Sequence, residues 1–421
     1  MGQGSQNLSY MRILILLTAS FPYGSKETFI ESELPIMCHS FDKVITYALY
    51  DNDNIREIDY PDNYYHYSAC STKRERVLSI LKVILIIEFW KELLYIIRSR
   101  THVWPRMMHL IKFTSYAITP YATIVKSIKQ WNKDSDDNEL YFYSYWLVEH
   151  AFLALKLKNK FCGSLSFSRA HGYDLYESRD KYGYIPYRRY LCNQLDYVFP
   201  ISENGKKLLE GYGGRADVVI SRLGTIDYGL SPFEKDDKQL TIVSCSWCAP
   251  VKRINLIIEA LSLIKSKPIK WIHIGDGAEL TKLQSLASER LKDNITFEFK
   301  GRLSNQDIIC FYQVTSVDLF INVSSSEGIP VSIMEAQSFG IPTIATNVGG
   351  VSEIVVDSYN GWLLNVDCKP ETISRVLDEY ACMSDWEIGN MRHHARDLWN
   401  EKYNANTNYK DFYSGLTKEL K

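Results

Sequence analysis

One segment, residues 318–342, constrains the fold more than any other part of the chain. It opens with the apolar run Asp318–Val323, which predicts a buried strand of a parallel sheet. A Ser/Gly turn follows, and then Pro330, which is favoured in the first turn of a helix because it lacks an N–H group that would go unbonded there. Gly340 and Pro342 predict the end of that helix. A strand, a turn and a helix N-terminus in this order direct free N–H groups at an anion.

Two glutamates accompany the predicted anion site. Glu327 lies at the mouth of the predicted helix, and Glu335 lies about a turn and a half further along it. One carboxylate could reach a group beside a bound phosphate, and the other could reach a diol behind it. From residue type alone, Glu327 could equally be an acid that is favoured near a helix N-terminus, and Glu335 a solvated surface residue.

The whole string Ser324–Pro342 resembles the donor-binding signature of retaining glycosyltransferases of family 4, which have the GT-B fold. The next segment, Thr343–Ile354, is similar to the strand, Gly-Gly turn and helix that follow the signature in that family. The resemblance covers nearly the whole chain, is strongest over residues 240–365 and is absent over residues 72–133. It implies two Rossmann-like domains that face each other across a cleft. Strands that alternate with helices in both halves predict the same α/β, doubly wound architecture.

The predicted elements divide the chain into two domains and a tail. Residues 11–228 are expected to form an N-terminal Rossmann-like domain that binds the acceptor. Residues 239–395 are expected to form a C-terminal Rossmann-like domain that binds the nucleotide sugar. A chain of 421 residues is long enough for two domains of ordinary size. The resemblance implies that a C-terminal helix over residues 396–421 crosses back and packs on the first domain.

The resemblance also implies roles for residues in both halves. Glu327, His171 and Lys252 would be catalytic. Glu327 would lie by the donor hexose, His171 would contact the sugar or the leaving phosphate, and Lys252 would neutralise the diphosphate. Glu335 would accept hydrogen bonds from the ribose hydroxyls. The other donor-binding residues implied in this way are Arg253, Gly24, Gly328, Ile329, Pro330, Val331, Gly275 and Arg302.

The phosphate loop departs from the family pattern. Ser246 and Trp247 stand where the family has a Gly-Arg pair, and Arg253 stands where it has a second glycine. Lys252 keeps the position of the family lysine. Arg253 is the candidate to supply the missing guanidinium to the diphosphate. From spacing alone, both basic residues would be solvated surface charges.

Residues 72–133 have an unusual composition, with twelve Lys or Arg against three Glu. Within this segment residues 77–97 are strongly apolar, but four charged residues make the run too interrupted for a membrane-spanning helix. These are Lys82, Glu88, Lys91 and Glu92. The run predicts either an amphipathic helix on an anionic membrane face or a helical hairpin packed on its own domain. The basic excess favours the membrane.

Composition limits the other partners. A net charge of −2 argues against a nucleic-acid-binding protein, and nine scattered cysteines predict reduced thiols. The first ten residues lack the pattern of a secretory signal, so a cytoplasmic location at the inner face of the cell membrane is expected. No Asp-x-Asp pair follows a predicted strand, because Asp134 and Asp136 lie in a polar loop. We therefore expect neither a metal ion nor a cofactor.

These inferences predict a retaining, metal-independent glycosyltransferase. It would move a hexose or N-acetylhexosamine from a nucleoside diphosphate sugar, with a UDP-sugar favoured, to a lipid-linked or oligosaccharide acceptor. The expected pathway is the biosynthesis of a surface polysaccharide such as capsule, O-antigen or exopolysaccharide. Two alternatives are a sugar-nucleotide 2-epimerase of the same architecture and a non-catalytic sugar-nucleotide-binding partner subunit.

Overall fold

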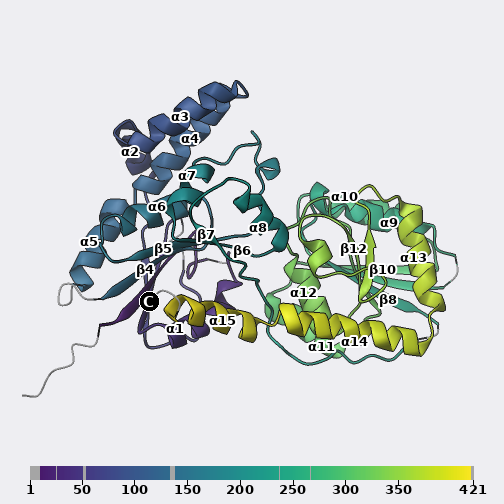
Figure 1. Ribbon diagram of the computed structural model, residues 1–421. Helices are drawn as coiled ribbons and strands as arrows, with labels where there is room; N and C mark the ends of the chain where they lie inside the picture. The colour runs from purple at the N-terminus through teal and green to yellow at the C-terminus, as the bar shows by residue number, and fades with distance from the viewer. Residues whose placement is uncertain are drawn as a thin grey trace, which may run out of the picture. The chain divides into compact units, whose positions relative to one another are not determined.

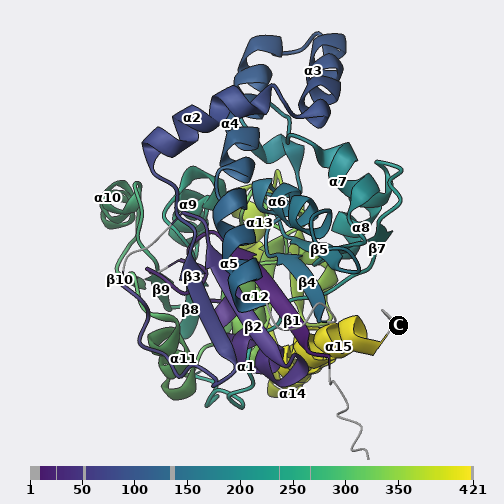
Figure 2. The same ribbon diagram turned by 90° about the vertical axis from the view of Figure 1, so that its left-hand side faces the viewer.

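The computed structural model describes residues 10–24, 26–50, 54–132, 138–236, 238–265 and 267–418. It divides into two compact units, each built on a parallel sheet with helices packed on it (Figures 1 and 2). Unit 1 contains the chain up to Ile201, Gly205–Ser221 and the chain from Tyr409 onwards, and unit 2 contains Ser202–Asn204 and Arg222–Asn408. The expected loop with Asp134 and Asp136 lies outside the described residues.

Unit 1 has a seven-stranded sheet of order β3-β2-β1-β4-β5-β6-β7, in which all neighbouring strands are parallel. The central strand β1 is a continuous apolar run and is buried after its first residue, as expected of a strand covered by helices on both faces. The strands are β1 (Arg12–Thr18), β2 (Lys43–Ala48), β3 (Tyr64–Ser68), β4 (Glu139–Ser144), β5 (Leu165–Ala170), β6 (Tyr197–Pro200) and β7 (Asp217–Val218). The helices are α1 (Ile30–Ser40), α2 (Lys73–Val83), α3 (Ile87–Ser99), α4 (Val103–Ile118), α5 (Tyr121–Trp131), α6 (Glu149–Lys158), the 3-10 turn η1 (Glu177–Arg179), α7 (Arg188–Gln194) and α8 (Glu203–Glu210).

The apolar run at residues 77–97 forms a helical hairpin rather than one helix. Its two arms, α2 and α3, are separated by Ile84–Ile86, and both pack on α4. Ser79 joins α2 to α4 through hydrogen bonds of 2.7 Å with the hydroxyls of Ser115 and Thr119. Figures 1 and 2 both show α2 and α3 at the outer end of unit 1, away from its sheet. Of the two predicted arrangements, the packed hairpin is therefore present.

Unit 2 has a six-stranded parallel sheet of order β10-β9-β8-β11-β12-β13, the same winding as the first six strands of unit 1. The strands are β8 (Leu240–Cys245), β9 (Ile269–Ile274), β10 (Ile295–Gly301), β11 (Leu319–Asn322), β12 (Thr343–Thr346) and β13 (Gly361–Leu364). The helices are η2 (Pro250–Lys252), α9 (Ile254–Ser262), α10 (Leu280–Arg290), α11 (Asn305–Val314), α12 (Val331–Ser338), η3 (Val351–Glu353), α13 (Pro370–Cys382) and α14 (Asp385–Lys402). The last helix, α15 (Ala405–Lys418), starts in unit 2 and belongs to unit 1 from Tyr409 onwards. The expected fold class, two doubly wound α/β domains, is confirmed.

The segment at residues 318–342 folds as predicted, into β11, a turn and α12. Pro330 is the N-cap residue, with an extended ψ of 122°, so α12 begins one residue later than expected. At the other end, Gly340 has a φ of 73° and its amide donates to the carbonyl of Gln337 at 2.9 Å. The amide of Ile341 donates to the carbonyl of Ala336 at 3.1 Å. This pair of bonds is a Schellman motif, which requires the positive φ that glycine tolerates.

The unit boundaries differ from the predicted domain boundaries. The tail was expected to leave the second domain at residue 396, but α14 is continuous there and belongs to unit 2. Arg396 holds α14 in unit 2, because its guanidinium donates to the carbonyl of Ser338 and to both carboxylate oxygens of Asp227. Only the chain from Tyr409 onwards belongs to unit 1. The first domain likewise ends at Ser221, before the expected residue 228.

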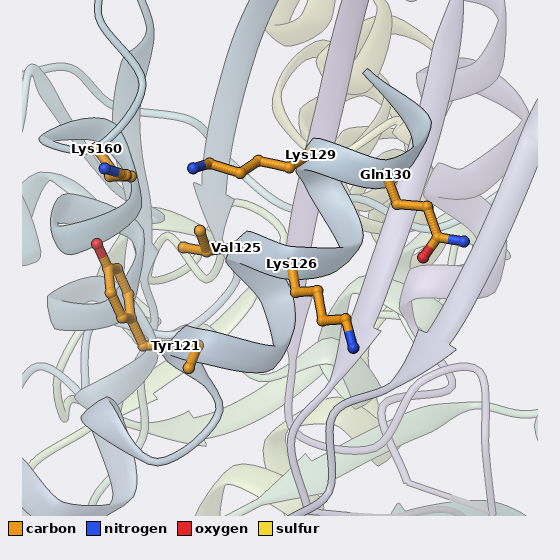
Figure 3. Close-up of a pocket in the computed structure, with 7 residues that line it drawn as sticks. Tyr121, Val125, Lys126, Lys129, Gln130 and Lys160 are labelled. Carbon is orange, nitrogen blue, oxygen red and sulfur yellow. The ribbon is translucent and has the colours of Figure 1, made fainter. Parts of the chain in front are cut away.

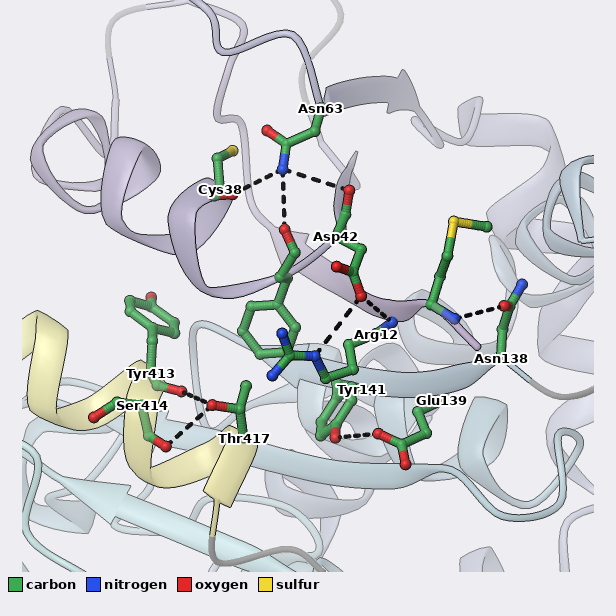
Figure 4. A network of polar contacts seen from close by, with 12 residues as sticks. Arg12, Cys38, Asp42, Asn63, Asn138, Glu139, Tyr141, Tyr413, Ser414 and Thr417 are labelled. Atoms are coloured by element: carbon green, nitrogen blue, oxygen red, sulfur yellow. Dashed lines mark hydrogen bonds and ion pairs between the residues drawn. The ribbon is translucent and has the colours of Figure 1, made fainter. Parts of the chain in front are cut away.

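A buried ion pair fastens α15 to unit 1. The side chains of Arg169 and Glu33 are 0% exposed and in direct contact. Glu33 also accepts a hydrogen bond of 2.7 Å from the hydroxyl of Tyr413 on α15, and the guanidinium of Arg169 lies 4.6 Å from the ring centre of Phe412. Nearby, Asn63 donates to the carbonyls that end α1 (Figure 4). The C-terminal helix therefore packs on the buried ion pair and supplies one hydrogen bond to the Glu33 carboxylate.

We predict that Glu33→Ala lowers the free energy of unfolding by about 3–5 kcal/mol, because it leaves Arg169 charged and unpaired in the core. The measurement is urea unfolding followed by circular dichroism. Glu210→Ala is the matched control, since the Glu210 side chain is 53% exposed and its ion pair with Lys206 contributes little. Equal stability of the two variants would contradict the role assigned to the buried pair.

Candidate functional site

Two glycines hold the turn that precedes α12. Gly349 has a φ of 57°, and a Cβ atom there would lie 1.9 Å from the carbonyl oxygen of Glu327. Gly350 donates its amide to the carbonyl of Gly328 at 2.8 Å, and its Cβ would lie 2.7 Å from the side chain of Ile329. Any other residue at these positions would push the turn away. The Gly-Gly pair after β12 thus fixes the backbone of residues 327–329.

The start of α12 presents unbonded amides. Within the described part of the chain, no acceptor bonds the N–H groups of Gly328, Ile329, Val331 and Ser332. A helix N-terminus also carries a partial positive charge from its aligned peptide dipoles. This position can therefore bind an anion, as predicted from the sequence.

Lys252 and Glu327 are in direct contact beside these amides. The Lys252 Nζ atom lies 2.5 Å from Oε1 of Glu327, and the two side chains are 22% and 10% exposed. Their loops are joined by a backbone hydrogen bond of 2.8 Å from Ser325 to the carbonyl of Val251. The lysine therefore has an internal counter-ion, and an incoming anion competes with Glu327 for it.

Arg253 has a structural role. Its φ is 50°, the left-handed region, where a glycine would be less strained. Its Nε donates to the carbonyl of Val323 at 2.6 Å, its Nη2 to that of Ser324 at 3.3 Å, and its Nη1 to that of Val366. These bonds join the loop after β8 to the end of β11 and to the loop after β13. The role of Arg253 at a diphosphate stays a prediction.

The side chains of Trp247 and Arg302 form a cation–π contact, which was not predicted from the sequence. The Trp247 side chain is 58% exposed, and the Arg302 guanidinium lies 5.8 Å from the centre of its ring. Within the described residues no carboxylate pairs with Arg302. Gly275 packs closely against the residue before Trp247, because a Cβ atom at Gly275 would lie 1.9 Å from the carbonyl oxygen of Ser246. The sequence signal was present only as the unexpected Trp247 in the phosphate loop.

Glu335 is a buried carboxyl group on α12, not a solvated one. Its side chain accepts a hydrogen bond of 2.7 Å from the side-chain amide of Asn305, the first residue of α11. Burial raises the pKa of Glu335 to about 7, and the bond from Asn305 opposes that shift. Asn305 was not predicted, because a contact across thirty residues of chain leaves no local pattern.

His171 lies in unit 1, immediately after β5, and is held by Asp174. The carboxylate of Asp174 accepts from the amide of His171 at 2.8 Å and from that of Leu147 at 3.0 Å, and lies 3.4 Å from Nδ1 of the ring. Burial acts to raise the pKa of Asp174, but these hydrogen bonds outweigh it and lower the pKa. Tyr145 stacks on the imidazole, and the ring of Trp146 lies against it at a tilt of 51°. Nε2 of His171 has no partner within the described residues.

The backbone groups of Gly24 are hydrogen-bonded within unit 1. Its φ is 61°, but its amide donates to the carbonyl of Asn54 at 3.1 Å and its carbonyl accepts from Nε of Arg56 at 2.7 Å. The amides after β1 are also occupied: the carboxylate of Glu27 accepts from residues 19, 20 and 21. The role of Gly24 in donor binding stays a prediction.

A pocket of about 700 Å³ lies in unit 1, apart from every predicted site residue (Figure 3). Figure 3 shows Lys129 of α5 pointing across it towards Lys160. The residues that line it are Tyr121, Ala122, Val125, Lys126, Lys129, Gln130 and Lys160. Among the described residues, no group of three His, Cys, Asp or Glu is placed to hold a metal ion.

We predict that Glu335→Gln stabilises the ligand-free protein only at high pH. Because the pKa of Glu335 is raised from 4.5 to about 7, its contribution to stability is present below pH 4.5 and is lost as the pH rises through 7. Glutamine cannot ionise, so the variant should gain about 2–3 kcal/mol near pH 8.5 and almost nothing near pH 5. Urea unfolding at both pH values tests this, with Glu289→Gln, whose side chain is 70% exposed, as the control. The same difference at both pH values would refute it.

Comparison with known proteins agrees with this geometry. Residues 231–395 match the model of the family described as glycosyl transferases group 1. The putative colanic acid biosynthesis glycosyltransferase WcaL of Escherichia coli K12 is 27% identical over 220 residues, which are 49% of this chain and 52% of WcaL. The O-antigen biosynthesis glycosyltransferase WbnH of Escherichia coli is 26% identical over 195 residues, or 46% of this chain and 54% of WbnH. The chain thus spans about half the length of the curated relatives it matches.

Solved structures resemble the whole chain. The lipopolysaccharide outer core galactosyltransferase WaaB aligns with a TM-score of 0.69 at 16% identity, over 97% of this chain and 100% of WaaB. The HepE protein of Anabaena, in complex with UDP, aligns with a TM-score of 0.65 at 14% identity and the same coverage. The predicted resemblance is confirmed over residues 231–395, which match the glycosyl transferases group 1 model, and the two units have the GT-B fold.

Proposed function

We propose that the chain is a retaining, metal-independent glycosyltransferase of surface-polysaccharide biosynthesis. It transfers a hexose or N-acetylhexosamine from a nucleoside diphosphate sugar to a lipid-linked or oligosaccharide acceptor at the inner face of the cell membrane. The observation that carries the proposal is the group of unbonded amides at the start of α12 with Lys252 beside them. The relatives named for colanic acid and O-antigen biosynthesis support the pathway, and the HepE complex with UDP supports a UDP-sugar.

The main chemical task of such an enzyme is to stabilise the departing diphosphate. Amides held in place by Gly349 and Gly350 are already oriented, so they need no reorganisation when charge develops on the leaving group. Lys252 adds a positive charge at the same place. Together they can replace the divalent cation that other diphosphate-leaving reactions use.

The two glutamates take different parts in the proposed reaction. Glu327 leaves Lys252 when the diphosphate binds, and then holds a hydroxyl of the donor sugar and favours the positive charge that develops on its ring. Glu335 accepts hydrogen bonds from the ribose diol, a contact that its burial on α12 makes specific. Retention follows when the acceptor attacks from the face on which the diphosphate leaves and the leaving phosphate oxygen takes its proton.

His171 is the proposed contribution of unit 1. Asp174 fixes the imidazole so that Nδ1 faces the carboxylate and Nε2 is free of other partners among the described residues. Nε2 can therefore donate to, or accept from, a hydroxyl of the donor sugar or a phosphate oxygen. Asp174 acts as a positioning residue, since it reaches only the histidine and backbone amides.

We predict that Lys252→Met lowers the rate of nucleoside diphosphate release by at least about a hundredfold, because one preorganised charge at the leaving group is lost. The assay measures release from UDP-, GDP- and ADP-sugars, with and without a membrane lipid extract. Lys300→Met is the matched control, since Lys300 lies on β10 of the same unit and pairs with Glu298 at 2.7 Å. NMR of the product gives the anomeric configuration, which should match that of the donor.

Other results of the same assay would reject the transferase. Conversion of the donor to its epimer without an acceptor would identify a sugar-nucleotide 2-epimerase. Binding of a nucleotide sugar without release under any condition would identify a non-catalytic partner subunit. Equal activity of the Lys252→Met and Lys300→Met variants would remove Lys252 from the diphosphate site.

A further inference from the structure

Helix α3 turns an apolar face outward. Its buried side chains, Phe89 and Ile96, face the rest of unit 1. On another side of the helix, four large apolar residues follow one another at spacings of three and four, so they share one face. These are Ile87, Trp90, Leu94 and Ile97, which are 69%, 49%, 53% and 50% exposed. A surface helix of a soluble protein normally places polar residues there.

Helix α2 and the following loop also expose large apolar residues. Val77, Leu81 and Leu85 are 63%, 71% and 78% exposed. Helix α2 is held to the protein by the opposite side, where the buried hydroxyl of Ser79 bonds that of Ser115 on α4. We call residues 77–98 of α2, α3 and their loop the hairpin surface. Exposed large apolar residues gathered on two neighbouring helices of the chain mark a site of interaction.

The acidic residues of α2 and α3 are engaged within unit 1. Glu75 closes the capping box at the start of α2. Glu88 lies 3.8 Å from Nζ of Lys156, and Glu92 accepts a hydrogen bond of 2.6 Å from the hydroxyl of Tyr184. None of these carboxylates is therefore available to neutralise the exposed basic residues of the hairpin.

The exposed cations of the hairpin have no such partners. Lys82, Lys91, Arg98 and Arg100 are exposed, and within the described residues none of them forms an ion pair. Lys91 and Arg98 each follow a residue of the apolar stripe directly, so they border it along the length of α3. The hairpin surface is therefore apolar in its centre and positive at its edges.

We propose that the hairpin surface docks on an anionic lipid bilayer, lying in the interface without spanning it. An anionic bilayer has an apolar layer beneath negative headgroups. The apolar stripe matches the apolar layer, and the unpaired cations that border the stripe match the headgroups. Trp90 suits this position, because its indole N–H already donates to the carbonyl of Ile84 at 2.9 Å and needs no water. No helix in the described part of the chain is long and apolar enough to span a membrane.

The inference rests on the proposed function: membrane binding would let the enzyme meet a lipid-linked acceptor by diffusion in two dimensions. Its test is independent of catalysis. The full chain is sedimented with vesicles of phosphatidylcholine alone or mixed with phosphatidylglycerol, in the absence of any nucleotide sugar. We expect binding to the mixed vesicles only, and weaker binding at high salt.

Two variants locate the contact. Lys91→Gln with Arg98→Gln should weaken binding to the mixed vesicles by roughly thirtyfold. Leu81→Ser with Leu94→Ser should weaken it by at least about tenfold. The control, Leu230→Ser with Val314→Ser, changes equally exposed apolar residues of unit 2 and should bind like the wild type. Circular dichroism confirms that each variant is folded.

Three outcomes would overturn the inference. One is no binding to either kind of vesicle. Another is equal binding by the hairpin variants and the control. The third is a wild-type dimer that the Leu81→Ser and Leu94→Ser changes dissociate, which would assign the hairpin surface to a second copy of the chain. A failure of nucleotide release in the transferase assay would leave the vesicle result standing.

Discussion

The functional unit depends on the fixed position of the turn between β11 and α12. On one side, Arg253 and the amide of Ser325 join this turn to the loop after β8. On the other side, Gly349 and Gly350 allow the loop after β12 to pack directly on it. Strands β8 and β11 are neighbours at the point where the winding of the sheet reverses, and α/β sheets bind ligands at such points. The amides at the start of α12 and the side chain of Lys252 therefore lie at the carboxyl ends of β8 and β11, where the strand order reverses.

The two units share the order of their strands, but the loops that follow those strands differ in how their backbone amides are bonded. In unit 1 the amides after β1 are occupied by the carboxylate of Glu27, whereas in unit 2 the amides at the start of α12 have no acceptor among the described residues. The loop after β1 is therefore self-bonded, whereas the turn after β11 presents amides that can bind an anion. The contact of Lys252 with Glu327 gives the lysine a counter-ion within the protein.

The sequence predicted those features that local chemistry determines. The strand, turn and helix at residues 318–342 were correct because apolar runs, proline and glycine act over a few residues. The hydrogen bonds of Arg253 and Gly24 were not predicted because they go to carbonyls distant in sequence, which spacing cannot reveal. Asn305 and the contact of Arg302 with Trp247 were missed for the same reason. The tail boundary was wrong because Arg396 binds residues more than fifty positions away.

The central claim is that Lys252 and the start of α12 bind the donor diphosphate, and that Glu327 pairs with Lys252 when no diphosphate is bound. Calorimetric titration of UDP into the Glu327→Gln variant tests this claim. The change keeps the shape of the side chain but removes the charge that competes for Lys252. The account predicts that this variant binds UDP at least as tightly as the wild type while sugar transfer is lost. Loss of UDP binding in parallel with transfer would contradict it.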